Sequence, residues 1–235
     1  MNPTLEKIKQ RGHWYIRFRG EQYNPQRLST EVQCDELLRR LVVRLRGWNY
    51  PHYPREGAIY GPNYCEGTVD WEGHTEFWRF YQSGQFVHYL ALREDWIAED
   101  TWFMRDPRFA AIQPGSALFV INTIYTLTEV YEFLKRLTSH DVYGDAVTVS
   151  LELSPIDNRH LRLLDDFHRA PLMGDYESRV PKFDWQKTYR RDEVLETSSE
   201  LALDVIQKLF LLFQWGRQPV DTFRGDQQAL LKKLV

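Results

Sequence analysis

The chain has 235 residues, 43% hydrophobic and 14% aromatic, which is enough to bury a core and predicts a folded globular protein. Its longest apolar runs, such as residues 117–121, are far shorter than the roughly 20 residues of a membrane-spanning helix, so we expect no membrane association. The charged N-terminus does not resemble a secretion signal. Cys34 and Cys65 are the only cysteines, and two thiols without a pattern predict a reduced, cytoplasmic protein.

The net charge of −3 is unevenly distributed along the chain. Residues 1–46 contain ten Lys and Arg against five Asp and Glu, whereas residues 47–235 contain twenty against twenty-eight. The candidate phosphate contacts in the basic part are Arg17, Arg19, Arg44 and Arg46. Each phosphate that such residues neutralise increases affinity for nucleic acid. A solvated basic face, or a face that binds an acidic partner, explains the same bias.

The first elements are a strand and a helix. In residues 12–19, apolar side chains alternate with Tyr15, Arg17 and Arg19, which is typical of a half-buried strand. Thr30, with a Gln three residues later, predicts the start of a helix over 30–41. A short strand is expected over 42–45, followed by a loop rich in Pro and Gly over 48–64.

Residues 48–103 contain fifteen of the 34 aromatic residues and five of the eight Trp. Within this block the alternation predicts three strands, which cover 68–71, 75–82 and 85–92. A two-residue turn at Ser83 and Gly84 would make the last two strands a hairpin and would place Arg79 opposite His88. Both faces of this hairpin are largely apolar, so we expect a β-meander that is covered on both sides.

The second half of the chain mixes helices and strands. Apolar spacing predicts a helix from about 127 to 140 and another from Asp192 to Gly216. The strands that we expect here cover 147–153, 161–164 and 183–189. A short peripheral helix is expected within 221–235. We therefore predict one α+β domain over residues 1–235, with an antiparallel or mixed sheet, an aromatic β-meander and two main amphipathic helices that cover it.

No motif for catalysis, phosphate binding or metal binding occurs in the sequence. His52, Cys65, His74 and His88 could converge, but their spacing matches no metal motif, so we expect neither a metal nor a cofactor. A nucleophile elbow and glycine-rich phosphate loops are absent. A metal-dependent nuclease would need acids brought together around magnesium, and Asp165 with Asp166 is the candidate pair.

Three stretches resemble a bacterial domain of unassigned function that can follow a Schlafen-type AlbA module, which is a nucleic-acid-binding module. They are residues 44–52 (RLRGWNYPH), 77–86 (FWRFYQSGQF) and 199–204 (SELALD). The resemblance covers most of the chain from about residue 12 to 215, and it supplies no catalytic residues. It implies a regulatory or sensing module in a bacterial defence or mobile-element setting.

These observations favour a non-enzymatic binding, adaptor or sensor domain that takes a protein partner or a small ligand. The candidate binding residues of the aromatic block are Arg79, His88, Trp48, His52, Trp71 and Trp78. Core packing is the competing interpretation of each Trp, whereas an Arg among rings has no apolar reason to be there. The alternative is a nucleic-acid-binding protein, with the four N-terminal arginines on phosphates and aromatic rings on bases. The nuclease is the less favoured alternative.

Overall fold

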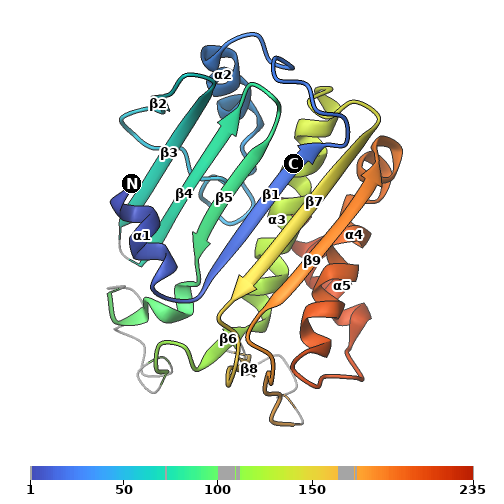
Figure 1. Cartoon of the computed structure of the whole chain (residues 1–235). Coiled ribbons are helices and arrows are strands. Elements are labelled where there is room, and N and C mark those ends of the chain that lie inside the picture. The colour runs from blue at the N-terminus through green and yellow to red at the C-terminus, as the bar shows by residue number, and fades with distance from the viewer. Residues whose placement is uncertain are drawn as a thin grey trace.

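The computed structural model describes residues 2–71, 73–99, 109, 112–163, 172 and 174–234. These residues form two layers, a twisted sheet and a set of helices behind it (Figure 1). The sheet is antiparallel and has seven strands in the order β2-β3-β4-β5-β1-β7-β9. The predicted α+β class with an antiparallel sheet is therefore confirmed.

The strands of the large sheet are β1 (His13–Gly20), β2 (Ile59–Tyr60), β3 (Tyr64–Trp71), β4 (His74–Tyr81), β5 (Phe86–Ala91), β7 (Ala146–Ser154) and β9 (Phe183–Arg190). A separate parallel pair consists of β6 (Ala117–Phe119) and β8 (His160–Arg162). The helices are α1 (Pro3–Lys9), α2 (Glu31–Leu41), α3 (Val120–Ser139), α4 (Arg191–Leu211) and α5 (Val220–Leu231). Short 3-10 turns occur at η1 (Arg93–Asp95), η2 (Ile97–Glu99) and η4 (Lys232–Leu234).

The core lies between the sheet and α3 and α4, which pack across the same face (Figure 1). On β1 the alternating residues Trp14, Ile16 and Phe18 are buried against this helical layer. The α3 stripe that the sequence predicted is buried as well, because a side chain every three or four residues faces the sheet. Two amphipathic helices therefore cover one face, as predicted.

The other face of the sheet is largely uncovered. Among the described helices, α1 is the one that packs on it, over the ends of β4 and β5 (Figure 1). Ile8 of α1 forms a small cluster there with Phe77, Ala91 and Trp96. The expectation that the meander is covered on both sides is wrong, because beyond this cluster and the buried Thr75 the outward side chains are half-buried or exposed.

The register of the β4–β5 hairpin differs from the predicted one by one residue. The structure pairs Trp78 with His88 and Arg79 with Val87. The predicted pairing of Arg79 with His88 is therefore wrong. Because successive side chains of a strand point to opposite faces, Arg79 lies on the uncovered face and His88 faces the helices.

The length of the turn explains this register. The N–H of Tyr81 donates to the carbonyl oxygen of Gln85 at 2.9 Å, so three residues, 82–84, form the loop. Gly84 takes a φ of +79°, the left-handed conformation that a three-residue hairpin loop places at its glycine. A loop of three residues instead of two shifts the pairing by one position.

Three local predictions need comment. The strand expected over 42–45 is wrong, because Val43 makes one isolated bridge with Tyr50 and no longer ladder. The helix expected within 221–235 is present as α5, whose Phe223 and Leu230 join the main core. The strand expected over 161–164 is the short β8.

In the part of the chain that the structure describes, no helix has the length and hydrophobicity to span a bilayer.

Candidate functional site

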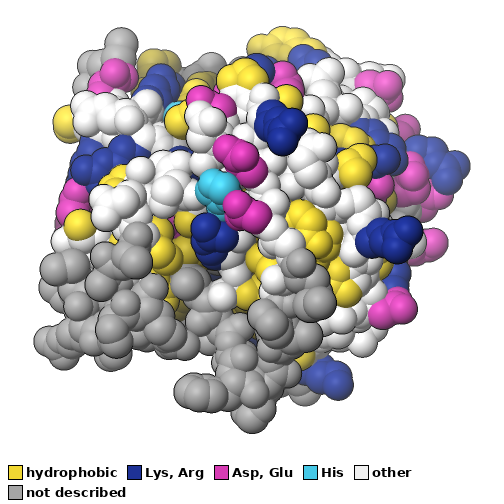
Figure 2. All heavy atoms as spheres, turned by 90° about the horizontal axis from the view of Figure 1, so that it is seen from below, with side chains coloured by type: hydrophobic (Ala, Val, Ile, Leu, Met, Phe, Trp, Pro, Cys, Tyr) yellow, Lys and Arg dark blue, Asp and Glu magenta, His cyan; other side chains and the backbone are white. Residues whose placement is uncertain are grey.

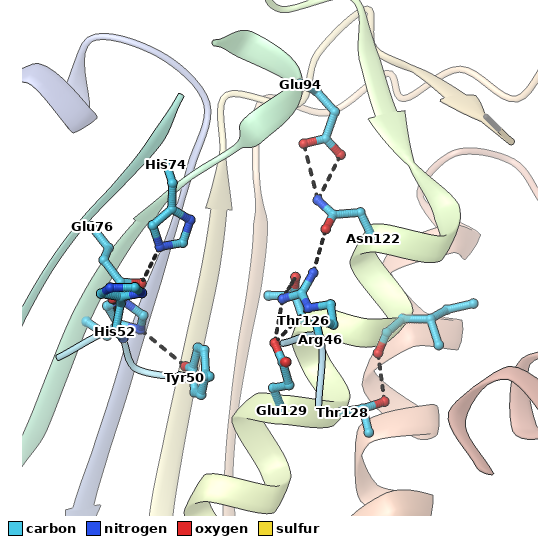
Figure 3. Close-up of polar contacts among 12 residues, drawn as sticks. Arg46, Tyr50, His52, His74, Glu76, Glu94, Asn122, Thr126, Thr128 and Glu129 are labelled. Carbon is cyan, nitrogen blue, oxygen red and sulfur yellow. Dashed lines mark hydrogen bonds and ion pairs between the residues drawn. The ribbon is translucent and has the colours of Figure 1, made fainter. Parts of the chain in front are cut away.

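A buried polar cluster lies between the meander and α3 (Figure 3). Glu76 of β4 accepts a hydrogen bond from the backbone N–H of His52, and its other oxygen lies 3.2 Å from Nε2 of His88. Nδ1 of His88 is in turn 3.2 Å from the hydroxyl of Tyr50. Because His88 is fully buried, this chain of contacts holds the loop that follows α2 onto the sheet and offers no surface to a ligand.

The charge of Glu76 is held by its neighbours. Burial raises the pKa of this carboxyl, but His88 and His74, whose Nε2 atoms lie 3.2 and 3.5 Å from it, outweigh burial and hold the pKa well below its usual range. Three predicted site residues belong to this arrangement, His52, Trp78 and His88, and Trp78 donates its ring N–H to the carbonyl oxygen of His52 at 2.9 Å. Trp78 and His88 are therefore core residues, which is the competing interpretation that the sequence allowed.

A second part of the cluster surrounds Arg46. Its guanidinium binds Glu129 of α3 through Nε at 3.0 Å and Nη2 at 2.5 Å, and Nη1 donates to Asn122 at 2.7 Å (Figure 3). Burial raises the pKa of the Glu129 carboxyl, although Arg46 lowers it. Arg46 is 15% exposed and is occupied by this pair. Its predicted role as a phosphate contact is not compatible with this position.

A small cavity adjoins the cluster, and Trp48 and His74 are among its lining residues. Its volume is about 40 Å³, which is room for little more than a water molecule. The guanidinium of Arg46 lies 5.3 Å from the ring centroid of Trp48. Trp48 thus packs beside the Arg46 ion pair, and the cavity next to it is too small for a drug-sized ligand.

Arg79 is held on the uncovered face by an ion pair. Its Nη2 lies 2.5 Å from Glu66 of β3, and its guanidinium stacks on Tyr64 at 4.1 Å from the ring centroid. Tyr81 lies 3.3 Å from Nη1. The charge of Arg79, a candidate binding residue, is therefore already neutralised by its cross-strand neighbour.

Arg17 and Arg19 have a different environment on the same face. Each is a β1 residue, and neither lies within ion-pair distance of an acidic side chain in the described structure. Arg17 is half-buried and donates to Ser150 at 3.3 Å, and its Nε atom is buried without a hydrogen-bond partner among the described residues. Arg19 is exposed. These two cations are available to an anion in a way that Arg79 is not.

Aromatic rings stand beside these arginines. Tyr15 lies opposite Tyr89 of the neighbouring strand, with 4.9 Å between their ring centroids, and His13 lies 6.0 Å from Tyr89. Lys9 of α1 lies 5.3 Å from the Tyr89 ring. The sequence indicated that Tyr15 shares a face with the arginines, but it did not single out Tyr89, because the wrong hairpin register hid which residues of β5 face outward.

The remaining candidates lie elsewhere. Arg44 donates to Asn49 and belongs to the segment next to α3, away from the uncovered face. Trp71 ends β3 and is exposed, with the His52 ring 6.0 Å away. Among the predicted residues, the structure therefore brings together Arg17 with Arg19, His52 with Trp71 and Trp78, and Arg46 with Trp48.

Two other kinds of site can be assessed. Among the residues that the structure describes, no group of three or more His, Cys, Asp or Glu side chains could hold a metal ion. The nuclease pair Asp165 and Asp166 lies outside the described residues.

At the end of the molecule that carries β8, acidic and basic side chains are interspersed over the described surface (Figure 2). His160 there lies 2.7 Å from Asp175.

No family model matches this chain, and no curated protein or solved structure is significantly similar to it. The function therefore has to be argued from the geometry.

Proposed function

We propose that this chain is a non-enzymatic binding module that holds single-stranded nucleic acid across the uncovered face of its sheet. One observation carries the proposal: Arg17 and Arg19, without acidic partners in the described structure, lie on the same face as the paired rings of Tyr15 and Tyr89. We call these four residues the β1–β5 platform.

The platform combines the two interactions that single strands require. Arginines neutralise the backbone phosphates, and each released counterion contributes to affinity. Aromatic rings on an open sheet stack on unpaired bases, which no duplex exposes. The nearest acid on this face, Glu152, lies opposite Tyr15 and is paired with Lys182 at 2.9 Å, so it repels phosphate less than a free carboxylate would.

Other ligands fit less well. The buried cluster has a cavity of about 40 Å³, and its polar groups contact one another, which leaves no room for a small-molecule ligand. The resemblance to a bacterial domain that can follow nucleic-acid-binding modules supports the proposed ligand by analogy alone. On the same ground we propose a defence or mobile-element setting.

The direct test is binding of a fluorescent oligonucleotide of about twelve uridines or thymidines, a length that spans typical single-strand sites. We expect its fluorescence anisotropy to rise on titration with the protein, and a duplex of equal length to bind more weakly. The Arg17→Ala/Arg19→Ala variant should lose at least about tenfold in affinity, which corresponds to about 1.4 kcal/mol. No binding at low salt, or equal binding by this variant, would contradict the proposal.

A further inference from the structure

The edge of the sheet at β3 is incompletely paired. β2 covers Cys65 and Glu66, and the N–H of Gly61 donates to the carbonyl oxygen of Tyr64 at 2.9 Å. Alternate residues of an antiparallel strand direct their backbone groups to the same side. Like Tyr64 and Glu66, Thr68 and Asp70 therefore direct their N–H and C=O groups toward the edge of the sheet. Within the described ranges, no segment pairs with this side of β3 beyond Glu66.

A groove runs along this unpaired edge. Its volume is about 580 Å³, within the range of ligand sites, and one wall is formed by the last four residues of β3, 68–71. The other wall comes from the loop after α2 and contains His52, Pro54, Arg55 and Glu56. Because the loop bounds the far side, the groove admits a single extended strand more readily than the edge of a second folded sheet.

Large apolar side chains are exposed at this edge. Trp71, on the wall of the groove, is 48% exposed, and Ile59 at 62% and Tyr60 at 51% are exposed on β2, which pairs with the other end of β3. An edge that combines unpaired backbone groups with exposed apolar side chains favours the addition of another strand.

The loop wall of the groove presents one cation, Arg55. Arg55 is exposed and makes no ion pair with an acidic residue in the described part of the chain. Asp70, on the β3 wall, is bound by Lys7 at 2.8 Å and is thereby neutralised. Arg55 and Glu56 on the loop wall are thus the charges of the groove without an ion-pair partner in the described structure, and Arg55 is the one that can bind an acidic side chain.

We propose that an extended peptide segment of a partner protein adds to β3 in this groove. Its backbone pairs with Thr68 and Asp70, an apolar side chain packs on Trp71, and an acidic side chain binds Arg55. This surface is separate from the β1–β5 platform, so the inference stands independently of the nucleic-acid proposal.

The test starts from the intact chain and a random peptide library displayed on phage. We expect enriched peptides to alternate apolar with other residues and to include an acidic position. A fluorescent synthetic copy of the enriched peptide is then titrated with the wild type and with Thr68→Pro, which removes the outward N–H without touching the pairing of β3 with β4. We expect at least about a tenfold loss of affinity.

Matched variants control for the fold. Thr68→Val keeps the N–H but loses the bond from Asn2 to the Thr68 hydroxyl, and it should bind the peptide like the wild type. Arg55→Glu should weaken the acidic peptide and strengthen a copy in which Lys replaces the acid. If Thr68→Pro fails to fold, Trp71→Ser, at an exposed position, provides the second test and should lose affinity as well.

Three outcomes would overturn the inference: no peptide is enriched, the enriched peptide binds Thr68→Pro and Trp71→Ser as tightly as the wild type, or sedimentation shows a dimer that Thr68→Pro abolishes. The last outcome would assign the edge to a second copy of the chain.

Discussion

Tyr15 of β1 lies directly opposite Tyr89 of β5, and their ring centroids are 4.9 Å apart. Both rings are half-buried on a sheet face that helices leave largely open. Most core aromatics lie on the opposite face, where Phe18 stacks on Phe86, and Phe77 and Trp96 are buried under α1 at one end of the open face. The position of the Tyr pair, rather than the abundance of aromatics, marks the candidate site.

Replacing Tyr15 with Ala should weaken single-strand binding by about 1–3 kcal/mol, because one base loses its stacking partner. Tyr15→Phe keeps the ring and should bind as the wild type does. Oligonucleotide anisotropy measures both, and circular dichroism checks that each variant is folded. An equal loss for Phe and Ala would show that the hydroxyl, not the ring, matters.

Arg46→Met should reduce the free energy of unfolding by about 3–5 kcal/mol, because Glu129 would be left buried without its partner. Oligonucleotide affinity should not change under conditions where the variant is folded. Urea unfolding provides the first measurement and anisotropy the second. The control is Arg44→Met, which is exposed and should change stability by less than about 0.5 kcal/mol. If the Arg46→Met protein is folded and binds the oligonucleotide more weakly than the wild type, Arg46 contacts phosphate as the sequence predicted.

Stability should depend on pH through Glu76. Burial raises the pKa of this carboxyl, but His74 and His88 lower it below the ordinary 4.5, so the native state favours the ionised form. The stabilisation is present above the pKa of the unfolded state and is lost as pH falls through the native pKa. Glu76→Gln should therefore be less stable than the wild type at neutral pH, by about 1–3 kcal/mol. In urea titrations, the difference in free energy of unfolding between the wild type and Glu76→Gln should narrow below about pH 4.5. A difference that stays constant with pH would argue against the stabilisation of ionised Glu76 by His74 and His88.

The two cysteines should be unreactive in the folded protein. Burial raises the pKa of the Cys34 thiol to about 12 and that of Cys65 well above its usual range. The thiolate is the reactive form, so a chromogenic disulfide reagent should label neither residue at neutral pH and both after unfolding in guanidinium. Rapid labelling of native protein would show that the β3–α2 packing opens readily.

Much of the fold is predictable from the sequence because the apolar periodicities are regular. The alternation around Trp14 and the stripe on α3 each identify their element and its buried face. The short α1 has a capping Asn2 and a Pro at its start, yet its seven residues are too few to produce a periodic pattern.

The candidate site is less predictable because it depends on register and long-range pairing. One extra residue in the turn before Phe86 moves His88 from the face of Arg79 into the core. The partner of Arg46 is 83 residues away on α3, and nothing in the local sequence indicates it. The arginines of β1 are the exception, since strand alternation alone places Arg17 and Arg19 on one face.

The central claim is tested most directly by the salt dependence of oligonucleotide binding. Each phosphate contact contributes about 0.7 to the slope of log affinity against log salt concentration for single strands. Removing both contacts in Arg17→Ala/Arg19→Ala should therefore reduce the slope by about 1.4. The control is Arg40→Ala/Arg44→Ala, which removes the same charge at exposed positions on α2 and in the segment after it and should leave the slope unchanged. An equal reduction in both variants, or none in the first, would contradict the β1–β5 platform.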